Sequence, residues 1–302
     1  MDVDKGISAG DPALYARVSH LHFVARQLVA GVRTGSHLAV QRGFEAEFLG
    51  YRPYVAPHPL KDVDWRVYAR SDRLVVRERR AERELACLLV LDASADLGST
   101  PQKWARAVEA TAALAYAVLA NGDPVGLVIG AGEGSPERMI PARRARGQLA
   151  RILLALASTR PKGRAELGRL FEQVGEQARG RMLVGVISDF MEEPGAWAGA
   201  LGALARRRVD LRALQVYDRD ELALSAEEPA HLVSPETGRR FPIDPGAVRS
   251  AFGDVVRTWR GEVERAFVAQ RGLLYGLAAD DPPVPVLAAW LAGRPYVAAR
   301  AA

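Results

Sequence analysis

The sequence predicts an α/β fold built on a mostly parallel sheet flanked by helices. Residues 85–91 are seven consecutive apolar residues that stop at Asp92, a run too short for an amphipathic helix and typical of a strand buried on both faces. A second apolar run, residues 182–187, ends in the same way before Asp189. Stretches with helical spacing of apolar residues alternate with such runs, which favours a parallel sheet with crossover helices.

The composition is that of an ordinary globular protein. The 302 residues are enough for one α/β domain and an accessory module. Hydrophobic residues make up 49% and charged residues 25%, and the formal net charge is +5. The single cysteine, Cys87, rules out a disulfide within the chain, and its place in a buried strand predicts a small apolar side chain.

The sequence carries no sign of a membrane span or of a signal peptide. The first residues lack the basic-then-apolar order of a signal peptide, and no run approaches the roughly 18 apolar residues of a membrane span. We therefore expect a cytoplasmic protein. We expect residues 1–12 to be disordered, residues 13–84 to form an accessory segment packed on the core, and residues 85–302 to form the main domain with a C-terminal extension.

Each further element is predicted from its own local pattern. The accessory segment begins with a helix over residues 13–32. Turn residues and a switch from helical to continuous apolar patterns separate the elements of the main domain. We predict helices over 104–119, within 141–159, and over 197–207, 246–271 and 284–291, strands over 124–130, 209–217 and 272–278, and a hairpin within 231–241.

Polar residues cluster where the first apolar strand ends. Asp92, Ser94 and Asp96 follow it directly, and Asp189 follows the second apolar run. Ligands of open α/β sheets bind beyond the carboxyl ends of the strands, so we expect these four side chains at one edge. Hard oxygen ligands of this kind suit Mg²⁺ or Mn²⁺.

This pattern resembles the metal-ion-dependent adhesion site of von Willebrand factor A-like domains. In that family the first loop reads Asp-x-Ser-x-Ser, and further loops supply a Thr and an Asp. The resemblance implies a von Willebrand A-like fold with metal ligands at Asp92, Ser94, Asp96 and Asp189. Ala165 stands where the Thr is expected, and Asp96 replaces a Ser. We therefore expect a degenerate site without a bound cation, and partner binding that uses another surface.

A second set of residues precedes the main domain. It comprises Glu47, Arg52, Tyr54, Asp62, Asp64, Trp65 and Arg70. Their order resembles the bacterial domain-of-unknown-function 58 family, whose members carry a von Willebrand A-like domain. That resemblance implies association with MoxR-type AAA+ ATPases. From the residues alone, Arg–carboxylate pairs over aromatic anchors favour a structural clamp, with an active site as the alternative.

Two classes of function remain. The resemblance favours a non-catalytic protein-binding adaptor that works with a MoxR-type ATPase and its protein client. The alternative is a metal-dependent hydrolase that uses Asp92, Asp96 and Asp189. No Ser/His/Asp group, HExxH motif or Cys/His cluster supports catalysis, and no basic stretch interleaved with aromatics supports nucleic-acid binding.

Overall fold

The computed structural model describes residues 12–35, 48–55, 63–79, 85–130, 136–164, 166–178, 180–223, 230–235 and 238–296. The chain forms two compact units. The larger unit spans residues 1–37 and 85–302, and the smaller unit spans residues 38–84. The helix predicted near the N-terminus is therefore part of the larger unit.

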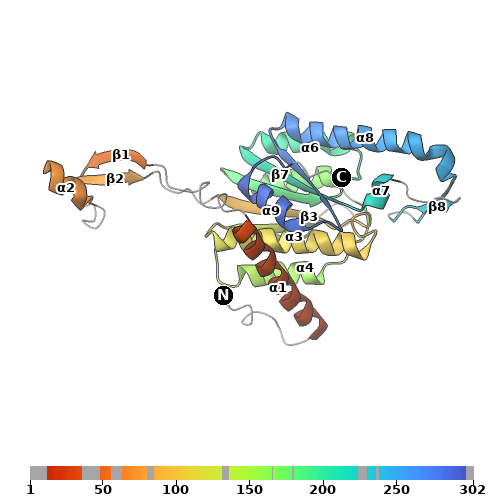
Figure 1. The fold of residues 1–302 in the computed structure, drawn as a ribbon, viewed down its shortest axis with the longest axis horizontal. Helices are drawn as coiled ribbons and strands as arrows, with labels where there is room; N and C mark the ends of the chain where they lie inside the picture. The colour runs from red at the N-terminus through yellow and green to blue at the C-terminus, as the bar shows by residue number, and fades with distance from the viewer. Residues whose placement is uncertain are drawn as a thin grey trace. The chain divides into compact units, whose positions relative to one another are not determined.

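A six-stranded sheet lies at the centre of the larger unit (Figure 1). Its strands are β3 (Ala86–Asp92), β4 (Val125–Gly130), β5 (Pro136–Arg143), β6 (Met182–Ser188), β7 (Val209–Tyr217) and β10 (Leu273–Ala278). Their order across the sheet is β10-β7-β6-β3-β4-β5. All neighbours are parallel except β4 and β5. The predicted mostly parallel α/β sheet is confirmed.

Helices cover both faces of this sheet (Figure 1). On one side lie α1 (Pro12–Gly35), α3 (Pro101–Ala120), α4 (Gln148–Ser158) and α9 (Pro283–Ala292), which pack on one another. On the other side lie α5 (Leu167–Gln177), α6 (Pro194–Ala205) and α8 (Pro245–Ala269). The layers give the Rossmann-type arrangement that alternating strands and helices predict.

The central strand β3 is buried on both faces, which explains its unbroken apolar sequence. Leu88 and Val90 belong to the core under α5, α6 and α8. This core contains a cluster of four aromatic rings whose neighbouring centroids are 5.4 to 6.0 Å apart. The rings belong to Phe171, Phe190, Trp197 and Phe267, and all are fully buried.

Three elements of the larger unit were not predicted from the sequence, namely β5, α5 and the short helix α7 (Arg219–Ala223). Strand β5 was not predicted, because Pro136 and Pro141 and its charged residues obscure the strand pattern. Such residues are tolerated here because β5 is an edge strand with one neighbour. Helix α5 was not predicted either, although its Leu170, Phe171 and Val174 pack into the core.

The C-terminal extension follows β7. It consists of the short helix α7 (Arg219–Ala223), the antiparallel hairpin of β8 (Ala230–Val233) and β9 (Arg240–Ile243), and then helix α8. Asp244 caps α8 by accepting a hydrogen bond of 3.0 Å from the amide of Gly246. The predicted hairpin and helix are confirmed.

In its described residues, the smaller unit consists of a two-stranded sheet and one short helix. Strand β1 (Phe48–Pro53) pairs antiparallel with β2 (Val75–Arg79), and α2 (Trp65–Ser71) lies between them in sequence. No helix in the described parts of either unit is both long and apolar enough to cross a membrane.

Candidate functional site

The carboxyl ends of β3 and β6 meet at a switch point of the sheet. From β3 the chain runs to β4 and β5 on one side, and then returns to β6 on the other side of β3. Ligands of doubly wound sheets bind at such a point, because the connections on the two sides leave in opposite directions. Asp92 ends β3, and Ser188 and Asp189 follow at the end of the neighbouring strand.

Asp92 is buried and hydrogen-bonded within the chain. Its Oδ1 accepts a bond of 2.9 Å from the amide of Ser94, and its Oδ2 accepts one of 2.6 Å from the hydroxyl of Ser188. Burial, followed by the negative charge of Asp189, raises the pKa of Asp92 to about 7. The bonds from Ser188 and Ser94 act in the opposite direction but are weaker.

Asp189 forms a buried ion pair with Lys103, a residue that the sequence analysis did not select. The ammonium of Lys103 lies 2.8 Å from Asp189 Oδ2, and both side chains are almost fully buried. The other oxygen, Oδ1, accepts a bond of 3.1 Å from the amide of Met191. Both carboxylates at this edge are therefore engaged by groups of the chain itself.

Lys103 also connects the site to two other segments. Its ammonium donates to the main-chain carbonyl of Asp96 at 3.0 Å and to Glu221 Oε1, on α7, at 2.8 Å. Burial alone would lower the pKa of Lys103, but Asp189 and Glu221 outweigh it and raise the pKa above its ordinary value. We call Asp92, Lys103, Ser188, Asp189 and Glu221 the carboxyl-edge cluster.

Helix α3 brings Lys103 to this edge because of how the helix begins. Thr100 is its N-cap and accepts a bond of 3.2 Å from the amide of Lys103, and Pro101 follows as the first helical residue. The Thr100 hydroxyl donates in turn to Asp218 Oδ2 at 2.6 Å. The start of α3 is thus fixed to the segment that leads into α7.

The turn after Asp189 holds an unusual backbone conformation. Phe190 has a φ of 58°, in the left-handed region that non-glycine residues seldom adopt. Its amide donates to Ser188 Oγ at 2.9 Å, and its carbonyl accepts a bond of 3.0 Å from Trp259 on α8. The conformation directs the Phe190 ring into the aromatic core while Asp189 stays at the edge.

The sequence-predicted metal ligands are brought together only in part. Ser94 is buried, and its hydroxyl accepts a bond of 3.4 Å from the amide of Leu97. The main-chain carbonyl of Asp96 accepts a hydrogen bond from the ammonium of Lys103. Ala165 lies outside the described residues.

These residues, as arranged, do not suit a divalent cation. An ammonium already lies against Asp189, and a divalent ion next to it would be repelled. Among the described residues, no three His, Cys, Asp or Glu side chains are grouped so as to hold a metal ion.

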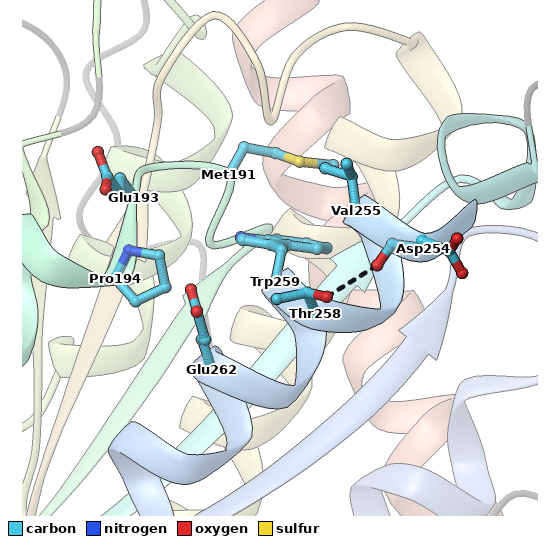
Figure 2. A pocket seen from close by; sticks show the side chains of 8 residues that line it. All are labelled: Met191, Glu193, Pro194, Asp254, Val255, Thr258, Trp259 and Glu262. Atoms are coloured by element: carbon cyan, nitrogen blue, oxygen red, sulfur yellow. Dashed lines mark hydrogen bonds between the residues drawn. The ribbon is translucent and has the colours of Figure 1, made fainter. Parts of the chain in front are cut away.

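An open pocket of about 490 Å³ is lined in part by Met191, whose amide donates to Asp189 of the carboxyl-edge cluster (Figure 2). Its floor and walls are apolar, and its rim carries carboxylates. The loop from β6 to α6 supplies Met191 and Glu193, and α6 supplies its first residue, Pro194. Helix α8 supplies Asp254, Val255, Thr258, Trp259 and Glu262. Val255 is 64% exposed, which is high for an aliphatic side chain. We call this the α8 pocket.

The family model described as "Protein of unknown function DUF58" matches residues 50–262. The chain belongs to the DUF58 family. The matched region of this DUF58 protein includes every residue of the carboxyl-edge cluster and of the α8 pocket.

Curated relatives of this DUF58 chain are uncharacterized. Proteins of Mycobacterium bovis and Mycobacterium tuberculosis are each 30% identical over 279 residues, covering 89% of this chain and 86% of theirs. Solved structures are more distant. A conserved hypothetical protein BatB from Bacteroides thetaiotaomicron has 16% identity and a TM-score of 0.38, covering 60% of this chain and 98% of its own. An aerotolerance-related membrane protein from Bacteroides fragilis has 15% identity and a TM-score of 0.40, covering 60% of this chain and 99% of its own.

The family-motif residues of the smaller unit differ in burial and in contacts. Asp64 is the N-cap of α2 and accepts bonds of 3.0 and 3.3 Å from the amides of Arg66 and Val67. Trp65 is 55% exposed and packs edge-on against Tyr68. Tyr54 is half-buried, and Arg70 is exposed in the last turn of α2.

The bonds of Asp64 to these amides give it a local capping role, and the clamp stays a prediction. Glu47, Asp62 and the side chain of Arg52 lie outside what the structure describes. Helix α1, the first part of the predicted accessory segment, packs on α3, α4 and α9, and for residues 38–84 the packing on the main domain stays a prediction.

Proposed function

We propose that this chain is a non-catalytic, cytoplasmic protein-binding adaptor. On the family resemblance, its partner is a MoxR-type AAA+ ATPase, and the pair acts on a protein client in assembly, maturation or remodelling. The observation that carries the proposal is the engagement of both carboxylates at the switch point. All four oxygens of Asp92 and Asp189 accept hydrogen bonds from the chain.

A carboxylate that accepts such bonds is a poor base or nucleophile, because reaction would break buried interactions. Asp92 and Asp189 are 2% and 1% exposed, so a substrate would also have to displace the groups that cover them. These features support binding as the function of the domain. On this proposal the binding surface lies elsewhere on the domain, where it is open to solvent.

The α8 pocket offers such a surface. Exposed apolar side chains surrounded by polar groups mark protein-binding sites more often than isolated ones do. Glu193, Asp254 and Glu262 on its rim favour a partner segment that carries basic residues beside an apolar anchor. Asp254 and Glu262 pair with Arg257 and Arg265 on the same helix, and these exposed pairs are weak enough for a partner to replace.

The runner-up is a hydrolase that uses Asp92, Asp96 and Asp189. The observation in its favour is the pKa of Asp92, about 7, since general acids and bases often have such shifted values. Burial beside another carboxylate is sufficient to produce that shift without a catalytic role.

The adaptor proposal is tested by affinity purification of the tagged full chain from its native host. We expect an AAA+ ATPase to be retained, with no effect of EDTA. Val255→Glu should reduce its retention at least tenfold. Val268→Glu is the matched control, because Val268 lies on the same helix and is 61% exposed but does not line the pocket.

Three results would count against the proposal. These are recovery of no AAA+ ATPase, equal retention by both variants, and turnover of a phosphate ester or peptide that Asp92→Asn abolishes. The last result would support the hydrolase instead.

A further inference from the structure

Lys103 is the most deeply buried charge of the carboxyl-edge cluster. Its side chain is 0% exposed, and its three nearest acceptors are an aspartate, a glutamate and a main-chain carbonyl at 2.8, 2.8 and 3.0 Å. An ammonium has three protons to donate. Each of the three is therefore matched by one acceptor.

These acceptors are the kinds of oxygen that otherwise hold a hard metal ion. They come from three separate segments, namely the loop after β3, the end of β6, and α7. Carboxylates and carbonyls from several loops are also the ligands of Mg²⁺ and Mn²⁺. The position of Lys103 among them is thus that of a central cation.

We propose that the ammonium of Lys103 is the built-in cation of this edge, and that it replaces a divalent metal there. It balances the buried charge of Asp189 and holds α7 against the sheet through Glu221. A bound metal keeps coordination positions that an acidic ligand can fill, whereas this ammonium has donated all its protons. The edge therefore captures neither a metal nor, through a metal, an acidic partner.

The proposal has a second consequence, which does not depend on the adaptor function. Removing the ammonium leaves Asp189, Glu221 and the Asp96 carbonyl around an empty position, with Asp92 nearby. Their uncompensated charge should then attract a divalent cation. The wild-type chain contains a latent metal site that Lys103 keeps closed.

The test is a titration of Mn²⁺ and Mg²⁺ into EDTA-treated full-length protein, followed by thermal unfolding. The wild type should show no saturable shift of Tm up to about 10 mM of either metal ion, a concentration well above the Kd of a typical metal site. Lys103→Met, which keeps the length of the side chain without its charge, should unfold at a lower temperature in EDTA. Mn²⁺ should then raise its Tm by about 5 °C or more at saturation.

Lys103→Ala repeats the test with space for a hydrated ion. Asp189→Asn, combined with either substitution, should abolish the response to Mn²⁺. Lys162→Met is the matched control, because Lys162 is exposed, and it should behave as the wild type does.

Two outcomes would overturn the proposal. One is a saturable Mn²⁺ shift in the wild type that Asp189→Asn removes. The other is that both Lys103 variants, folded or unfolded, fail to respond to Mn²⁺, since a cation that substitutes for the ammonium must restore the buried pair. Neither outcome depends on which protein the chain binds.

Discussion

Ser188 and Asp92 lie 96 residues apart in the chain and share a hydrogen bond of 2.6 Å across the junction of β6 and β3. The same hydroxyl accepts the amide of Phe190, so one side chain supports both the buried carboxyl and the strained turn. The geometry of the switch point therefore depends on the uncharged hydroxyl of Ser188.

Replacing Ser188 by alanine should destabilise the protein by about 1–3 kcal/mol, because it leaves a buried oxygen and a buried amide without their partner. It should also raise the pKa of Asp92 further, since the Ser188 bond lowers it. Urea unfolding measures the first effect. Ser99→Ala is the control, because Ser99 makes a similar bond of 2.8 Å to a carboxylate at an exposed position, and we expect it to change stability by less than about 0.5 kcal/mol.

The raised pKa of Asp92 predicts how stability changes with pH. In the unfolded chain the group ionises near its ordinary value of 3.8, whereas in the folded protein it ionises near 7. Between these values the folded state binds one more proton, so this group's contribution is full below the lower value and declines as pH rises through the higher one. The test is to measure the free energies of unfolding of the wild type and Asp92→Asn from pH 4 to pH 8, in steps of about 0.5. As pH rises over this range, the wild type should lose stability relative to Asp92→Asn. A difference independent of pH would contradict the raised value.

Gly185 in β6 allows α9 to pack closely on the sheet. A Cβ atom there would lie 2.5 Å from Cζ2 of Trp290 and 3.0 Å from Cδ2 of Leu89. Gly185→Ala should therefore cost about 1–3 kcal/mol through overpacking, measured by urea unfolding. Gly199→Ala is the opposite control, because in the interior of α6 its added Cβ would meet no heavy atom within 4 Å beyond its chain neighbours and its own helix backbone. It should stabilise the protein by about 0.5–1 kcal/mol, and equal effects of both substitutions would refute the packing argument.

Much of the fold was predictable because the inner strands are buried on both faces. Strands β3 and β6 are long apolar runs with clear ends, and their boundaries match the prediction within a residue. Strand β7 also matches its predicted range, although Asp210, Arg212 and Gln215 interrupt its apolar residues. Edge strand β5 could not be found this way, since it faces a neighbour on one side only and carries two prolines. The residues of β5 also do not indicate that it pairs antiparallel with β4.

The candidate site was predictable in position but not in chemistry. Asp92 and Asp189 were selected because they end apolar runs, and the sheet order does place them at neighbouring strand ends. Lys103 was missed because a lysine in the first turn of a helix is usually solvated. A signal was present: Lys103 lies four and seven residues before Ala107 and Ala110, on the buried stripe of α3. Extending that stripe one turn towards the N-terminus would have pointed to it.

The long sequence separations within the carboxyl-edge cluster determine when it can form. Lys103 meets Asp189 and Glu221 across 86 and 118 residues of chain. During synthesis, β3 and α3 leave the ribosome well before β6 and α7, so the lysine has no counter-charge and must stay in water until they arrive. Closing such long loops is slow because their entropy is lost before the contacts form. The carboxyl-edge cluster should therefore form late in folding. In a nascent chain that ends before α7, we expect the first turn of α3 to be frayed.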